Sequence, residues 1–105
     1  MSEIREWTRQ VGIQHWAGLR VGPEGALPAL MLHGWLDNAG SLLPLARALP
    51  GRCHHLPDLP GHGLSGHRPP GTWYHFIDYV SDLVAWMDAS GLARVDLIGH
   101  SMGGA

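Results

Sequence analysis

The chain has little cysteine, little net charge and no long hydrophobic run, and each shortage excludes a class of protein. Its 105 residues include one cysteine, Cys53, which excludes an internal disulfide framework and fits a reducing compartment. A net charge of −2 leaves no electrostatic footprint for nucleic acid or for an anionic membrane surface. The first residues are charged and lack the apolar segment of a secretory signal, and no stretch reads as a transmembrane helix. We therefore expect a cytoplasmic protein without a nucleic-acid or membrane partner.

The overall amino-acid composition is typical of a globular protein. Hydrophobic residues make up 45% of the chain and charged residues 15%, which suffices for one small core. No internal repeat, low-complexity segment or linker divides the sequence. We therefore expect residues 1–105 to belong to one domain.

Five strands are predicted from the distribution of apolar residues. Loose polar and apolar alternation over residues 4–20, interrupted by glycines, predicts two antiparallel strands. The apolar run 29–32 predicts a third strand of the kind that is buried on both faces. Two further strands are predicted at 52–57 and 95–98.

Two helices are expected between these strands. Asn38 or Ser41 is placed to cap the first, which would run to about Leu49. The second is predicted over residues 72–90, from an N-cap at Thr72 to a stop at Gly91, because apolar residues recur at three- and four-residue spacing. The stripe expected to pack on the sheet comprises Trp73, Phe76, Val80, Leu83 and Met87.

The alternation of strands and helices predicts an α/β fold. Parallel strands joined by right-handed crossovers would form most of the sheet, and the hairpin near the start would add an antiparallel part. Ligands of such sheets bind beyond the carboxyl ends of the strands. The loops after residues 32, 57 and 98 are therefore the places to look for a site.

The most informative of these loops is the pentapeptide Gly99-His100-Ser101-Met102-Gly103, which follows the apolar run 95–98. A G-x-S-x-G sequence between a strand and a helix turns sharply and exposes the serine hydroxyl at the sheet edge. Ser101 is therefore the candidate nucleophile. The N–H of Met102, at the positive end of the helix expected there, is a candidate oxyanion donor. Gly99 and Gly103 allow the strand and helix to approach closely.

A second loop, His33-Gly34-Trp35, follows the strand predicted at 29–32. Acyl-transfer enzymes of this layout place one oxyanion donor at this position, so we assign that role to the N–H of Trp35. Gly34 allows the backbone to come close to the reacting group. A third loop, running from Asp58 to Ser65, follows the strand at 52–57.

Together these three motifs resemble the α/β-hydrolase superfamily, and the stretch 32–39 is similar to the serine hydrolase-like proteins of that fold. The resemblance covers roughly residues 30–105. It implies the N-terminal half of an α/β-hydrolase domain, truncated after the nucleophile elbow, with Ser101 as nucleophile and the Trp35 and Met102 amides as oxyanion donors. It also implies a small-molecule substrate with an ester or related acyl bond, and no cofactor. The acid and the histidine of the triad lie downstream in the family, so this chain alone is expected to be inactive.

Several residues near these loops have plainer interpretations. Asp58 and His62 are expected to brace their loop by hydrogen bonds, and Asp37 to cap a helix instead of acting as a catalytic carboxylate. His100 is expected to be structural, because successive side chains at a tight turn point apart. The eight histidines show no spacing typical of a metal site, so we expect no metal.

A dinucleotide site is the alternative suggested by residues 61–66, which spell G-x-G-x-x-G after a strand. That site needs a helix to begin at the glycines, and Pro69 and Pro70 follow instead. The remaining alternative to a serine hydrolase is a catalytically silent binding or scaffold module with the same fold.

Overall fold

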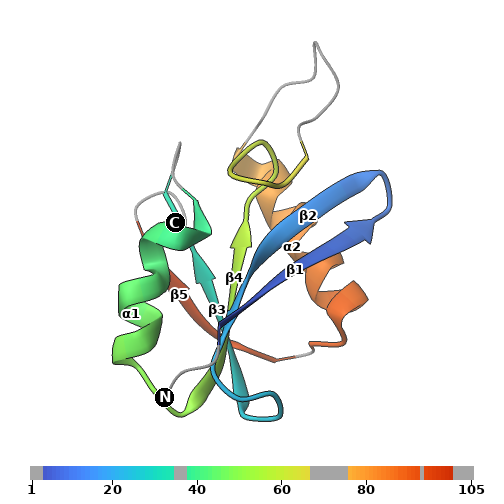
Figure 1. The fold of residues 1–105 in the computed structure, drawn as a ribbon. Coiled ribbons are helices and arrows are strands. Elements are labelled where there is room, and N and C mark those ends of the chain that lie inside the picture. Colours follow the sequence, from blue (N-terminus) through green and yellow to red (C-terminus); the bar gives the residue numbers. More distant parts are fainter. Residues whose placement is uncertain (1–3, 35–37, 67–75, 93, 101–105) are drawn as a thin grey trace.

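The computed structural model describes residues 4–34, 38–66, 76–92 and 94–100, which form a five-stranded sheet with helices on both sides (Figure 1). The strands lie in the order β1-β2-β4-β3-β5. Their bounds are β1 Ile4–Val11, β2 Gln14–Val21, β3 Leu27–Leu32, β4 Arg52–Asp58 and β5 Asp96–Gly99. All five strands that the sequence predicts are therefore present.

The strand directions are also those that the sequence predicts. β1 and β2 form an antiparallel hairpin, and β2 pairs antiparallel with β4. β3 pairs parallel with β4 on one side and with β5 on the other. The hairpin closes through Gly12 and Ile13, where Gly12 takes a φ of 60° that a residue without a Cβ adopts at little cost. The carboxyl ends of β3, β4 and β5 consequently meet at one edge of the sheet.

The first helix is divided in two, unlike the single helix expected. A 3₁₀ turn, η1 (Ala39–Leu42), leads into the α-helix α1 (Leu43–Ala48). Of the two candidate caps, Asn38 is the one used, because its Oδ1 accepts the N–H of Gly40 at 2.9 Å. The Ser41 hydroxyl donates to the Asn38 carbonyl oxygen at 2.9 Å.

The second helix is α2 (Phe76–Ser90), and it ends where the sequence predicts. Gly91 has a φ of 72°, and the N–H of Leu92 reaches back to the carbonyl of Met87 at 2.9 Å. This is a Schellman arrangement, in which a left-handed glycine lets the chain satisfy the last carbonyls of a helix. The expected start of the helix, at Thr72 and Trp73, lies outside the described residues. No helix in the described ranges is long and apolar enough to cross a bilayer.

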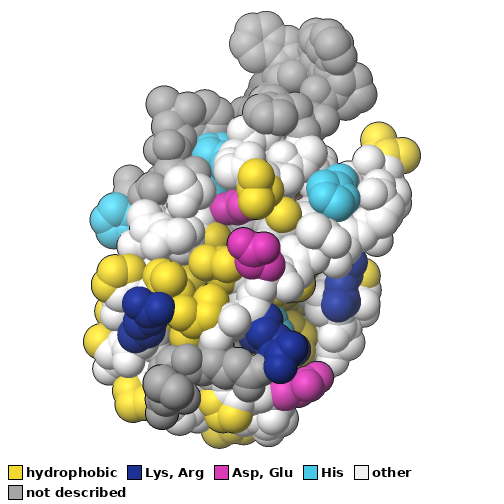
Figure 2. Space-filling model, in the orientation of Figure 1, with side chains coloured by type: hydrophobic (Ala, Val, Ile, Leu, Met, Phe, Trp, Pro, Cys, Tyr) yellow, Lys and Arg dark blue, Asp and Glu magenta, His cyan; other side chains and the backbone are white. Residues whose placement is uncertain are grey.

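Two hydrophobic clusters fill the two sides of the sheet, and neighbouring residues of one strand belong to different clusters. On the α2 side the buried members are Trp16, Leu30, Leu32, Leu59, Tyr79 and Trp86. On the α1 side they are Val21, Met31, Ala39, Leu42, Ala46 and Leu56. Figure 2 shows hydrophobic side chains gathered over α1 and the adjoining sheet.

The face of α2 that packs on the sheet differs in part from the prediction. Tyr79 and Trp86, seven residues apart, are 4% and 2% exposed, and Leu83 and Met87 are partly buried beside them. Val80 was expected to pack on the sheet but is 53% exposed. One residue advances the helix by about 100°, so Val80 lies at the margin of a face centred on the two aromatic residues. The aromatic side chains occupy the inner face because they bury the most apolar area.

Candidate active site

The loops predicted to form the site begin side by side at the carboxyl edge of the sheet. In the parallel pairing of β3 with β5, Leu32 lies opposite Gly99. The pairing extends one residue further, because the N–H of His100 donates to the carbonyl of Leu32 at 3.0 Å. The His33-Gly34 loop and the residue that precedes Ser101 therefore leave the sheet as neighbours.

Five residues with predicted roles in or beside the site lie outside the described residues. They are the candidate nucleophile, the two oxyanion donors, the glycine after the elbow and the acid expected to cap a helix: Ser101, Trp35, Met102, Gly103 and Asp37. Their roles stay predictions. The supporting residues His33, Gly34, Gly99 and His100 are described, and they lie at the edge where the sequence places them.

His33 is a buried connector between the first loop and the third. Its ring is 0% exposed, and Nε2 accepts the N–H of Leu59 at 2.9 Å. Nδ1 donates to the carbonyl of Gly34 at 2.7 Å. An imidazole nitrogen that accepts an amide proton carries none itself, so the ring is neutral with its proton on Nδ1. The ring centroid lies 4.9 Å from that of His62.

Asp58, at the end of β4, holds two loops through its two carboxylate oxygens. Oδ1 accepts the N–H of Ala39 at 2.7 Å, and Oδ2 accepts the N–H of Leu64 at 3.0 Å. The side chain is 6% exposed, so these bonds compensate for the loss of water. The predicted bracing role of Asp58 is confirmed. Its connection to Ala39 was missed, because no local pattern marks a contact between residues so far apart in the chain.

The third loop, from Asp58 to Ser65, is tied to the hairpin by its last residue. The Ser65 hydroxyl accepts the N–H of Ala17 at 2.9 Å and donates to the carbonyl of Asp58 at 2.5 Å. Gly66 extends this tie, since its N–H donates to the carbonyl of His15 at 2.8 Å. Among the described residues, 61–66 contain turns and bends and no helix, whereas a dinucleotide site needs a helix to begin at these glycines.

The same loop is also held to α2, through the carbonyl of Pro60. That oxygen accepts a hydrogen bond from the Tyr79 hydroxyl at 3.1 Å and one from Nδ1 of His62 at 3.1 Å. His62 is 6% exposed, and its side chain braces the loop as predicted. The loop is therefore fixed to β2, to β4 and to α2 at once.

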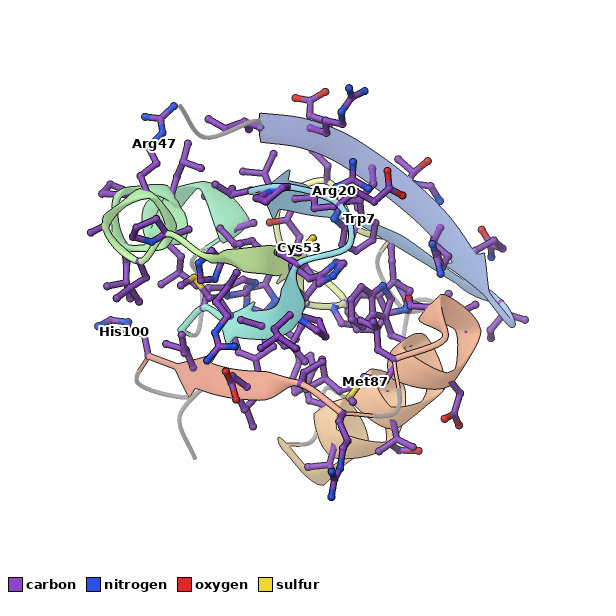
Figure 3. The ribbon with its side chains drawn as sticks, turned by 90° about the horizontal axis from the view of Figure 1, so that it is seen from below. Trp7, Arg20, Arg47, Cys53, Met87 and His100 are labelled. Atoms are coloured by element: carbon purple, nitrogen blue, oxygen red, sulfur yellow. The ribbon has the colours of Figure 1, made fainter. Side chains whose placement is uncertain are left out.

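His100 contributes to the edge through its backbone. Its side chain is exposed, and Figure 3 shows it pointing outward from the end of β5. The hydrogen bond from its N–H to Leu32 is made by the main chain, so the structural role expected of the side chain stays a prediction.

A cavity of about 560 Å³ lies next to this edge, between the hairpin and the start of η1. Asp58, Leu64 and Asn38 line it from the edge, together with residues of β1 and β2. Its lining includes neither His33 nor His100. It is therefore a groove beside the loops and not the space between them.

The two pKa shifts in the described structure lie away from this edge, on β4. Burial raises the pKa of the Cys53 thiol, and burial together with the neighbouring charges of Arg20 and Arg9 lowers the pKa of His55. Neither side chain belongs to the candidate site. Among the described residues, no three His, Cys, Asp or Glu side chains are placed to share a metal ion.

The mixed sheet, the helices on both of its sides and the three loops at one edge define an α/β protein of the hydrolase layout. Residues 28–105 match the alpha/beta hydrolase fold family, and the chain belongs to that family. The predictions of the fold and of the family are thus confirmed.

The chain is similar to proteins named for serine hydrolases. It is 46% identical over 84 residues to the serine hydrolase-like protein of Danio rerio, covering 79% of this chain and 26% of that protein. It is 39% identical over 95 residues to the serine hydrolase-like protein of Homo sapiens, covering 90% of this chain and 44% of that protein.

A solved structure with the same fold is that of a hypothetical protein from Pseudomonas aeruginosa PAO1. The match has a TM-score of 0.89 and 39% identity, and covers 93% of this chain and 35% of that one. The chain thus spans between about a quarter and somewhat under half of the lengths of these three proteins.

Proposed function

We propose that the chain contributes the nucleophile and the oxyanion hole of a serine hydrolase that acts on an ester or related acyl bond of a small molecule. The observation that carries the proposal is the hydrogen bond from the His100 N–H to the Leu32 carbonyl. It brings the residue before Ser101 against the residue before His33, as an acyl-transfer site at this edge requires. The names of the serine hydrolase-like relatives support the same class of reaction.

In the proposed reaction the Ser101 hydroxyl oxygen forms a bond to the substrate carbonyl carbon and its proton passes to a histidine. The resulting oxyanion is held by the N–H groups of Trp35 and Met102. The carbonyl re-forms as the bond to the leaving group breaks, and the histidine returns the proton to that group. Water, deprotonated by the same histidine, then attacks the acyl-enzyme and releases the acid and the free serine.

The histidine and its orienting acid are expected from parts of the family fold that lie downstream of these residues. Without such a base the serine hydroxyl stays protonated at neutral pH and is a weak nucleophile. Loss of a triad member in enzymes of this type costs on the order of 10⁶ in turnover. The 105-residue chain alone is therefore expected to have almost no hydrolase activity. Its cytoplasmic location stays a prediction.

The test is covalent labelling of the full-length product that contains this chain with a fluorophosphonate probe, followed by mass spectrometry of the adduct. We expect the wild-type protein to be labelled at Ser101 and Ser101→Ala to be unlabelled. Ser90→Ala, at the far end of α2, is the matched control and should label like the wild type. Labelling that survives in Ser101→Ala would exclude Ser101, and a folded wild type that is never labelled would favour a silent binding module.

A further inference from the structure

Both ends of the loop that carries Trp35 are tied to consecutive residues of the neighbouring strand and its loop. At the start, Nε2 of His33 accepts the N–H of Leu59 at 2.9 Å. At the end, the N–H of Ala39 donates to the Asp58 carboxylate at 2.7 Å. The two described ends of this loop, His33 and Ala39, are therefore both fixed to the end of β4.

The Asp58 anchor depends on a carboxylate. Both oxygens accept main-chain N–H groups, from Ala39 and from Leu64, and the side chain is almost fully buried. An asparagine has the same shape but only one acceptor oxygen, so its NH₂ group would face one of the two N–H donors. The main-chain N–H that faces this NH₂ group would lose its hydrogen bond, and the two donors would move apart.

The first loop and the third loop meet at this one side chain. The hydrogen bond from Leu64 holds the Asp58 carboxylate to the third loop. The backbone of Gly63 also packs closely against that carboxylate. A Cβ at Gly63 would come within 2.3 Å of the Asp58 carboxyl carbon. A movement of the Asp58 carboxylate must therefore be shared by both loops.

We propose that Asp58 and His33 are positioning residues for the oxyanion hole, because they fix the two described ends of the loop to which its predicted donor Trp35 belongs. This inference rests on the proposed function. Neither side chain touches the substrate in this role. A misplacement of about 1 Å in a catalytic group can cost about 10²-fold in rate, so loosening either anchor should lower kcat more than it changes KM.

A merely structural role would give a different result, and Ser65 separates the two. Its hydroxyl is as buried as the Asp58 carboxylate and ties the same third loop to β2 through Ala17. It also donates to the main-chain carbonyl of Asp58, but among its described contacts it makes no hydrogen bond to the Asp58 carboxylate or to the first loop. Ser65→Ala should therefore destabilise the protein while leaving the two anchors of the first loop in place.

The experiment measures kcat, KM and the melting temperature of the full-length product with a p-nitrophenyl ester, together with inhibition by a trifluoromethyl ketone, whose bound form carries the oxyanion. For Asp58→Asn we expect kcat to fall about 10- to 100-fold with KM within about 3-fold, and inhibition to weaken in parallel. For Ser65→Ala we expect a lower melting temperature with kcat within about 2-fold.

A second pair of variants tests the other anchor, the hydrogen bond between His33 and Leu59. This pair still tests the positioning role if Asp58→Asn fails to fold. In His33→Gln the side-chain amide can still reach the Leu59 N–H, whereas the shorter side chain of His33→Asn cannot. The glutamine variant should retain at least about 10-fold more kcat than the asparagine variant. Equal kcat in that pair, wild-type kcat in Asp58→Asn, or equal losses in Asp58→Asn and Ser65→Ala would overturn the positioning role alone. A wild type without any activity would overturn the proposed function and this inference with it.

Discussion

The main-chain N–H of His100 lies 3.0 Å from the carbonyl oxygen of Leu32, so two segments far apart in the sequence leave the sheet together. This contact is a continuation of the parallel pairing between β3 and β5, in which Leu32 faces Gly99. Parallel pairing aligns strand ends of the same polarity, and that places the two predicted motifs at one edge. The core, the loop ties and the charges around this frame lead to four predictions about stability.

Gly63 is predicted to tolerate alanine much less well than Gly12, although both have a left-handed backbone with φ values of 50° and 60°. At Gly12 a Cβ meets nothing within 4 Å, so the substitution costs only the backbone strain of about 1–2 kcal/mol. At Gly63 a Cβ collides with the Asp58 carboxylate, and moving that group breaks its hydrogen bonds, which adds about 1–3 kcal/mol. Urea denaturation of both variants measures the difference, and equal losses would show that the Asp58 bonds contribute little.

Trp86 is predicted to be the costliest residue of α2 to remove. It is 2% exposed, and its ring centroid lies 5.4 Å from that of Trp7 and 6.3 Å from that of Trp16. Trp86→Ala should cost about 3–5 kcal/mol of unfolding free energy, whereas Val84→Ala on the exposed face should change it by about 0.5 kcal/mol or less. A comparable loss in the valine variant would mean that the inner face of α2 is centred elsewhere.

His55 is predicted to make the protein less stable as the pH falls. Burial, and then the charges of Arg20, Arg9 and His54, lower its pKa in the folded state below the ordinary 6.5. The unfolded chain then binds the proton more readily, so stability decreases as the pH falls through about 6.5 and levels off below the folded pKa.

Removing the imidazole should weaken that dependence. The loss in urea midpoint between pH 7.5 and pH 5.5 should be smaller in His55→Asn than in the wild type, and NMR titration of the ring should show its lowered pKa. Arg20→Gln is a second check, because it removes a charge that lowers the pKa of His55. An unchanged pH profile in His55→Asn would assign the effect to other histidines.

The ion pair between Arg52 and Asp96 is predicted to contribute little. The two groups lie 2.9 Å apart and link the starts of β4 and β5, but their side chains are 38% and 59% exposed. Exposed pairs are worth about 0–1 kcal/mol and are screened by salt. Asp96→Asn should therefore lower the unfolding free energy by less than about 1 kcal/mol, and the difference should shrink in 1 M NaCl. A larger loss that persists in salt would point to a role for Asp96 beyond the ion pair.

The parts of the fold that sequence analysis predicted correctly depend on neighbours along the chain. The apolar run at β3, the turn at Gly12 and the stop at Gly91 are each set by a few consecutive residues. The face of α2 was predicted less well, since valine and tryptophan at helical spacing are equally apolar in a pattern. Only packing against the strands shows that Trp86 turns inward and Val80 outward.

The succession of strands and helices along the chain, the family and the motifs around His33 and Ser101 could all be predicted from the sequence, because they are properties of short segments and their spacing. Tertiary structure alone decided that Asp58 joins Ala39 to Leu64 and that His33 holds Leu59. Those bonds connect segments whose meeting depends on how the strands pair across the sheet. A hydrogen bond of this kind leaves no periodic pattern in the chain, and it forms only when folding brings the donor and the acceptor within about 3 Å.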